Sequence, residues 1–206
     1  MISRFLQIMF VMQLVYSFPL LAQTVDKESL LHKFSFCLVC HGYQAQGNTT
    51  VLAPPLAGIE PWYLSSSLAA YRAGTRHTSA KALEMQAAVR MLDESDEPQL
   101  MALLAQMPTV REEAEAASIQ QLERGAQGYA QYCAACHGVE AEGNELLAAP
   151  GLARLSSWYL QSAWQAFREG NRGDSQASSA AQQMRQYSQS LPTDLAIEDV
   201  IAFLSN

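Results

Sequence analysis

The feature that most constrains this chain is an internal duplication at an offset of 96 residues. Two pentapeptides reveal it, Cys37-Leu-Val-Cys40-His41 and Cys133-Ala-Ala-Cys136-His137. The same register continues through Trp62-Tyr63-Leu64 and Trp158-Tyr159-Leu160, and it becomes 99 after three inserted residues near 173–179. A unit this long, present twice, differs from the short, many-copy units of solenoid proteins. We therefore expect two small globular domains in tandem.

The duplication also predicts the domain boundaries. We expect a first domain over 23–108, a charged, helix-prone linker over 109–117 and a second domain over 118–206. Residues 1–22 begin with one basic residue and continue as an apolar stretch that ends in alanine, which is typical of a secretory signal peptide. Because the stretch is nearly long enough to cross a bilayer, an uncleaved anchor is the alternative. In both cases the rest of the chain is exported.

Both units are predicted to be helical, and the fold class is therefore all-α. We expect helices over 26–40, 65–72 and 95–106, and over 118–136, 161–168 and 194–204, from apolar spacing and from glycines at helix ends. Alternating β-branched runs, which would indicate strands, are absent from the sequence. Long loops over 42–61 and 138–157 leave such small domains little apolar surface to bury. A large apolar group is expected to complete each core.

The repeated pentapeptide indicates what this group is. C-x-x-C-H is the attachment signature of c-type haem. Two thiols three positions apart on one helical turn point the same way, so each can add to a haem vinyl group, and the following histidine can ligate the iron. We predict two covalently attached haem c groups, bound by Cys37, Cys40, Cys133 and Cys136, with His41 and His137 as iron ligands. A zinc ribbon needs two cysteine pairs about 15–20 residues apart, and a thioredoxin-like motif needs βαβ surroundings. The sequence has neither pattern.

The second axial position of each iron can be filled by methionine, by histidine or by no protein ligand. After His137 the chain contains one methionine, Met184, and no histidine, so Met184 is the predicted ligand of the second haem. In the first unit only Met85 matches the repeat, because it precedes a leucine by seven residues as Met184 does. We predict Met85 as the other ligand. The remaining candidates there are His77, Met91, Met101 and Met107.

Further repeated residues have two interpretations each. Pro54 and Pro150 either offer a carbonyl to the second nitrogen of the ligating imidazole or form structural turns. Tyr63 and Tyr159 either hydrogen-bond a haem propionate or pack on the ring, and packing is favoured. Arg72 and Arg168 either pair with propionates or stabilise helix C-termini. His32 has no counterpart in the second unit and is expected on the surface.

The net charge of the chain and the predicted iron ligands limit which functions are possible. The chain has 13 basic and 20 acidic residues, a net charge of -7, whereas nucleic-acid binders carry a basic surface, so no nucleic-acid partner is expected. Two closed axial positions leave no open iron site for a substrate, so electron transfer is favoured over catalysis. The alternatives are a cytochrome subunit of a larger dehydrogenase and a diheme peroxidase. A peroxidase needs an open or displaceable iron ligand and an acid–base residue beside it.

These residues resemble those of class I cytochromes c, and the chain after residue 22 resembles the diheme cytochrome c4 family. The resemblance rests on the two C-x-x-C-H-G motifs, on Pro54-Pro-Leu-Ala-Gly58, and on Tyr71-Arg72-Ala-Gly74-Thr-Arg76 with its copy Phe167-Arg168-Glu-Gly170-Asn-Arg172. Arg154-Leu155 departs from the family, which has Gly-Gln there. The resemblance implies two tandem class I cytochrome c domains that face one another. It also implies a periplasmic electron carrier whose partners are redox proteins, such as a membrane cytochrome complex or a terminal oxidase. Membrane association is expected only if the N-terminal segment stays uncleaved.

Overall fold

A computed structural model of the chain describes residues 27–76, 79–110, 116–192 and 195–206. The predicted signal peptide over 1–22 and the candidate ligand His77 lie outside the described residues. Regular structure in the described part is helical, apart from two isolated β-bridges, Asn48–Ala53 and Asn144–Ala149. The prediction of an all-α fold is confirmed.

The helices occur in the same order in the two halves. The first unit contains α1 (Lys27–Lys33), α2 (Ser35–His41), α3 (Pro61–Arg72), α4 (Ala80–Val89), the 3-10 turn η1 (Glu94–Asp96) and α5 (Glu97–Gln106). The second contains α6 (Ile119–Tyr132), α7 (Ala134–His137), η2 (Glu145–Leu147), α8 (Ser157–Arg168), α9 (Ser179–Ser190) and α10 (Ile197–Ser205). Helices α1 to α5 thus correspond to α6 to α10, with each cysteine motif close to the start of its unit.

Helices α4 and α9 were not predicted from the sequence. Each begins after a serine, Ser79 or Ser178, whose hydroxyl accepts a hydrogen bond from the backbone N–H three residues later. Such N-caps satisfy one of the free N–H groups at a helix start. The two helices carry the predicted ligands Met85 and Met184, so they determine where those side chains lie.

The core of the second unit is built on the crossing of α6 and α10. Gly125 and Gly128 are both buried on α6 and allow the two helices to approach closely. The Arg124 Nε donates to Asp199 Oδ2 on α10 at 2.6 Å. The Tyr129 ring, 2 % exposed, lies 5.8 Å from the Phe203 ring between their centroids. This crossing fixes the helix that leads into Cys133 and His137.

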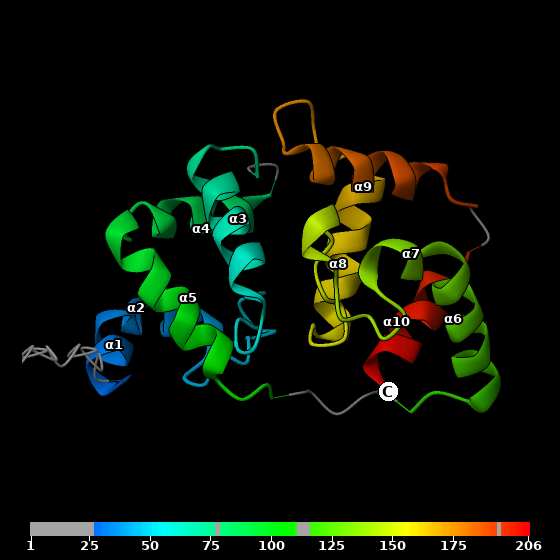
Figure 1. The fold of residues 1–206 in the computed structure, drawn as a ribbon, viewed down its shortest axis with the longest axis horizontal. Helices are drawn as coiled ribbons and strands as arrows, with labels where there is room; N and C mark the ends of the chain where they lie inside the picture. Colours follow the sequence, from blue (N-terminus) through cyan, green and yellow to red (C-terminus); the bar gives the residue numbers. More distant parts are fainter. Residues whose placement is uncertain (1–26, 77–78, 111–115, 193–194) are drawn as a thin grey trace, which may run out of the picture.

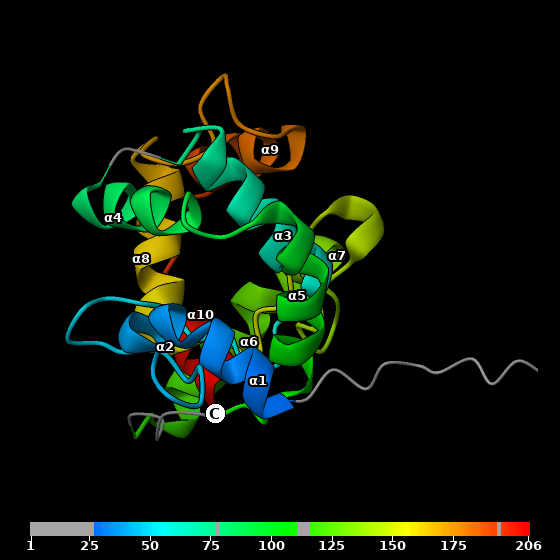
Figure 2. The ribbon, with the colours of Figure 1, turned by 90° about the vertical axis from the view of Figure 1, so that its left-hand side faces the viewer.

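The two units lie side by side (Figure 1). Helix α3 of the first unit and α8 of the second face the seam between them, and a view from the side shows α1, α2 and α5 in front (Figure 2). Residues 107–110 and 116–118, which include both ends of the predicted linker over 109–117, belong to no helix. The domain boundaries at 108 and 118 stay a prediction. Among the helices that the structure describes, none combines the length and the apolar character needed to cross a bilayer.

Candidate functional site

A cavity of about 420 Å³ lies mainly in the first unit, extends to residues of the second unit at the seam, and is lined by Cys37, Cys40, His41 and Met85 together. Most of its other lining is apolar and comes from α2, α3, α5 and residues that precede these helices, including Phe34, Leu38, Ile59, Leu64, Leu68 and Leu104. This volume lies within the range of about 300–1,000 Å³ that is typical of ligand sites. The cavity is therefore an apolar space with two thiols, an imidazole and a thioether at its wall.

The imidazole of His41 is held in one orientation. His41 is the last residue of α2, where Gly42 with φ 82° turns the chain away from the helix. Its Nδ1 lies 2.7 Å from the carbonyl oxygen of Pro54. A carbonyl can only accept, so Nδ1 carries the proton and Nε2 is left with a free lone pair. Burial lowers the pKa of His41, which keeps the ring neutral and able to bind a metal.

The second unit repeats this arrangement. His137 is the last residue of α7, and Gly138 follows it with φ 85°. Its Nδ1 lies 2.8 Å from the carbonyl oxygen of Pro150, and burial lowers the pKa of the ring. Of the two interpretations of Pro54 and Pro150, the structure favours the one in which their carbonyls orient the histidines.

The four cysteines are free thiols, arranged alike in the two units. Cys37 and Cys133 are half-buried, whereas Cys40 and Cys136 are exposed. Burial raises the pKa of both Cys37 and Cys133 to about 11, so these thiols are protonated at neutral pH. No group of three or more His, Cys, Asp or Glu side chains in the described parts of the chain is placed to hold a metal ion. A zinc site built from such residues therefore has no support there.

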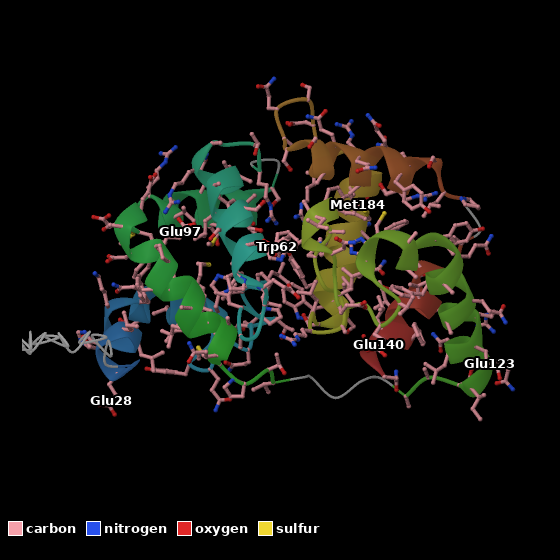
Figure 3. All side chains as sticks on the ribbon, in the orientation of Figure 1. Glu28, Trp62, Glu97, Glu123, Glu140 and Met184 are labelled. Atoms are coloured by element: carbon pink, nitrogen blue, oxygen red, sulfur yellow. The ribbon has the colours of Figure 1, made fainter. Side chains whose placement is uncertain are left out.

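The methionines of the first unit differ in where they lie. Met85 on α4 is half-buried and lines the cavity. Met101 and Met107 also line it but are buried in the core, at 4 % and 7 % exposure. Met91 is 72 % exposed and points away from the core. In the second unit Met184 is half-buried on α9 and points toward the side on which α7 lies (Figure 3).

A group of tyrosines and arginines fills the seam between the units, and its role was not predicted from the sequence. Arg172 of the second unit donates from Nη2 to the Tyr63 hydroxyl of the first at 3.2 Å. Arg76 and Arg172 both line the first-unit cavity, together with Tyr159. Burial acts to raise the pKa of Tyr159, but the two guanidinium groups outweigh it and lower that pKa. The two guanidinium groups therefore place positive charge at the seam side of a cavity whose lining is mostly apolar.

The sequence contained a signal for this group. Arg76 and Arg172 are exact counterparts in the repeat, and each stacks on an aromatic ring at another repeated position. The guanidinium of Arg76 lies 4.4 Å from the Tyr71 ring centre, and that of Arg172 lies 4.5 Å from the Phe167 ring centre. At this separation a cation is attracted by the face of the ring.

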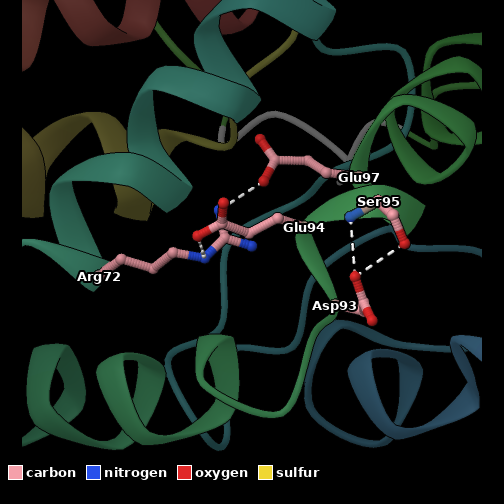
Figure 4. A network of polar contacts seen from close by, with 5 residues as sticks. All are labelled: Arg72, Asp93, Glu94, Ser95 and Glu97. Carbon is pink, nitrogen blue, oxygen red and sulfur yellow. Dashed lines mark hydrogen bonds and ion pairs between the residues drawn. The ribbon is translucent and has the colours of Figure 1, made fainter.

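The other repeated arginines are occupied elsewhere. Arg72 donates from Nη1 to Glu97 Oε2 at 2.5 Å, and its Nε lies 3.8 Å from Glu94 Oε1 (Figure 4). The same figure shows Asp93 accepting hydrogen bonds from the backbone and hydroxyl of Ser95 at the start of η1.

In the second unit, Arg168 donates from Nη1 to the carbonyl of Ser188. These contacts tie Arg72 and Arg168 to neighbouring helices, so pairing of these two residues with haem propionates is not supported. Arg76 and Arg172, in contrast, line the first-unit cavity.

Comparisons with known proteins agree with this geometry. The cytochrome c family profile matches residues 122–206. The structure of reduced recombinant cytochrome c4 from Pseudomonas stutzeri is similar with a TM-score of 0.65 and 25% identity, over 87% of this chain and 96% of that one. The chain is cytochrome c4-like. Its two C-x-x-C-H motifs and its likeness to a diheme cytochrome c4 imply two covalently attached haem c groups, as predicted from the motifs.

Two further solved structures share the fold. Cytochrome c4 from Acidithiobacillus ferrooxidans matches with a TM-score of 0.66 and 24% identity, over 83% of this cytochrome and 98% of that chain. Thiosulfate dehydrogenase (TsdBA) from Marichromatium purpuratum matches with a TM-score of 0.61 and 22% identity, over 82% of this chain but only 36% of that one. No curated protein sequence matches this cytochrome significantly.

Proposed function

We propose that this cytochrome is a periplasmic electron carrier in which each haem iron is ligated by one histidine and one methionine. The observation that supports it best is the convergence of Cys37, Cys40, His41 and Met85 on one apolar cavity. A haem bound there supplies a centre that takes up and releases one electron at a time. The surrounding residues hold it, orient its histidine and exclude water from it.

The proposed ligand set is His41 with Met85 and His137 with Met184. Both histidines are buried, neutral and fixed by a proline carbonyl, which suits a metal ligand. Both methionines are half-buried on the helix before a buried leucine, Leu92 or Leu191, in the same register of the repeat. A thioether opposite an imidazole gives a higher reduction potential than two imidazoles would.

Substituting each methionine tests this ligand set. In the oxidised protein, Met85→Ala and Met184→Ala should each remove about half of the methionine–iron charge-transfer absorption. Met101→Leu, which conserves volume in the same cavity, and Met91→Ala on the surface should leave the band intact. An unchanged band in Met184→Ala would show that this residue is not a ligand.

Exported location is part of the proposal and rests on residues 1–22, which have the composition of a signal peptide. Intact mass of the protein purified from the periplasm should correspond to residues 23–206 with two haem groups added. A protein retained in the membrane with residues 1–22 attached would indicate the anchor instead. We propose soluble or membrane-bound redox proteins, such as a terminal oxidase, as its partners.

A second candidate function is that of a relay within a larger dehydrogenase. It is favoured by the likeness to about a third of the thiosulfate dehydrogenase chain, which shows that this two-unit fold also occurs inside a larger enzyme. A carrier should purify alone and exchange electrons with soluble partners, whereas a relay should co-purify with a catalytic subunit. Size-exclusion chromatography of the native complex distinguishes them.

A further inference from the structure

The loops that follow α2 and α7 have the same backbone conformation. Each contains two alanine or leucine residues with left-handed φ angles at matching positions, Ala45 (54°) and Leu52 (57°), and Ala141 (58°) and Ala148 (50°). Each is closed by the equivalent antiparallel bridge. Residues at matching positions therefore occupy matching places on the surfaces of the two units.

The two loops differ in charge. The neutral Gln44, Gln46 and Thr49 of the first loop are replaced by Glu140, Glu142 and Glu145 in the second. The match extends to side-chain contacts, because Gln46 Oε1 accepts from the Gln44 N–H at 2.9 Å and Glu142 Oε2 accepts from the Glu140 N–H at 2.9 Å.

All three glutamates are exposed, and within the described ranges none of them forms an ion pair. The second loop thus presents three carboxylates that have no ion-pair partner among the described residues, where the first loop has no charged residue.

Exposed apolar side chains accompany the charges and lie close in sequence to the exposed cysteine of each haem motif. Val139 is 80 % exposed and Leu146 is 97 % exposed, and both follow Cys136 within ten residues. We call the residues Val139, Leu146, Leu147, Glu140, Glu142 and Glu145 the second face. The repeat counterparts of these residues form the first face, which consists of Tyr43, Thr50, Val51, Gln44, Gln46 and Thr49. Tyr43 is 89 % exposed, and the exposed Val39 and Leu52 are close to this face in sequence.

Exposed apolar side chains within one short loop are typical of a protein interaction site, and this loop directly follows the haem motif in sequence. The loops after α2 and α7 project to opposite sides of the molecule (Figure 2), so the two faces are separate sites.

We propose that the second face docks a redox protein with a lysine- or arginine-rich face, and that the first face does not. Charges at the rim of an interface attract the partner from a distance and set the rate of association, an effect that salt screens. Apolar side chains at the centre then make the short-lived contact. The inference rests on the proposed function, since a docked protein can exchange electrons only if the neighbouring cysteines hold haem.

The two faces provide their own control variants. E140Q/E142Q/E145T gives the second face the residues of the first, and Q44E/Q46E/T49E does the reverse. E123Q/E169Q/E198Q changes the net charge equally at exposed glutamates outside both loops. The probes are a lysine-rich mitochondrial-type cytochrome c and the same protein with its lysines acetylated. The dissociation constant is measured by calorimetry on the holoprotein at low and at physiological ionic strength.

In E140Q/E142Q/E145T, binding of the lysine-rich probe at low ionic strength should weaken about ten-fold and depend less on salt. The remote triple variant should bind almost as the wild type does, the reverse variant should bind more tightly, and the acetylated probe should not distinguish the variants. Equal weakening by the remote variant, or unchanged binding in E140Q/E142Q/E145T, would overturn the docking proposal. The proposed function is tested separately, by intact mass and by two one-electron steps in a potentiometric titration of the same samples.

Discussion

Two glycines on α6 allow a comparison in which the same substitution should have opposite consequences. A Cβ on Gly125 would overlap the backbone carbonyl of Asp199 and lie 2.8 Å from the Phe203 Cβ. A Cβ on Gly128 would meet only side-chain ends, 3.1 Å from Val200 Cγ2 and 3.4 Å from Leu195 Cδ1. A backbone carbonyl in a packed helix cannot move without moving α10, whereas the Val200 methyl group needs to shift by only a few tenths of an ångström and the Leu195 methyl group is at ordinary contact distance. Gly125→Ala should therefore separate the helices, and Gly128→Ala should not.

The expected size of the difference follows from two opposing effects. Alanine is favoured over glycine inside a helix by about 1 kcal/mol, and both variants gain this. Overpacking lowers the free energy of unfolding by about 1–3 kcal/mol. Because the added methyl group of Gly125→Ala overlaps backbone atoms, we take its cost at the upper end, about 3 kcal/mol. The net loss in the free energy of unfolding is about 2 kcal/mol for Gly125→Ala and close to zero for Gly128→Ala. For a unit of this size, 2 kcal/mol lowers Tm by roughly 10 °C.

The measurement is thermal and chemical unfolding of the two haem-loaded variants beside the wild type, followed by circular dichroism and by haem absorption. Because α6 leads directly into the second cysteine motif, haem absorption of the second unit should change at the lower temperature in Gly125→Ala. Equal stability of the two variants would refute the reasoning, since it would mean that the crossing of α6 and α10 can relax around an added methyl group.

Three further perturbations address the seam and the second haem motif. Replacing Arg154 with alanine removes its 2.5 Å hydrogen bond to the Gly58 carbonyl across the seam. Because Arg154 is largely exposed, we expect the free energy of unfolding to fall by only about 1 kcal/mol. Calorimetry should also show that the two units unfold less cooperatively. Tyr129→Phe removes a 2.6 Å hydrogen bond from the Tyr129 hydroxyl to the Gly138 carbonyl and should lower the free energy of unfolding by about 1 kcal/mol. Burial raises the pKa of Tyr129 above its ordinary 10.0, so the unfolded chain loses the phenol proton at a lower pH than the folded protein does. The stability that the neutral phenol contributes to the wild type should therefore decrease as pH rises above 10. The variant should show less alkaline destabilisation in denaturant titrations. Arg172→Gln removes a positive charge from the wall of the first-unit cavity. In a potentiometric titration it should lower the reduction potential of the first haem by roughly 40 mV, about 1 kcal/mol. Arg168→Gln is the control, because Arg168 donates to the Ser188 carbonyl in the second unit.

The chemistry of the site could be predicted from the sequence because it is encoded in short, contiguous motifs. C-x-x-C-H requires only that two thiols and an imidazole share one helical turn, and the structure provides that turn in α2 and in α7 with its N-cap residue Cys133. The hydrogen bond from each histidine to a proline carbonyl was one of two open interpretations, because it joins residues 13 apart through a loop whose path no local pattern defines. His32 was expected on the surface and is exposed there.

The missed features depend on contacts that local patterns do not describe. Helix α4 is rich in alanine, and α9 is rich in glutamine and serine; neither has the large apolar residues at helical spacing from which the other helices were predicted. Their serine N-caps were the available signal. The seam was missed because its pairs join one unit to the other: Arg172 reaches Tyr63 from 109 residues away, and no property of either sequence segment indicates that distance.

The seam also explains why one departure from the cytochrome c4 pattern is compatible with the fold. Arg154 is the repeat counterpart of Gly58, and the two residues contact one another across the seam. Positions related by a duplication meet in this way only near an axis that exchanges the two units. At such an axis two identical long side chains would compete for the same space, whereas one arginine and one glycine fit together. A close contact at the axis therefore requires that the arginine be present in only one of the two copies. Divergence between the two copies also placed three carboxylates on the loop after α7 and none on the loop after α2. The residues around each haem motif thus stayed equivalent in the two units, whereas the charges on their exposed loops did not.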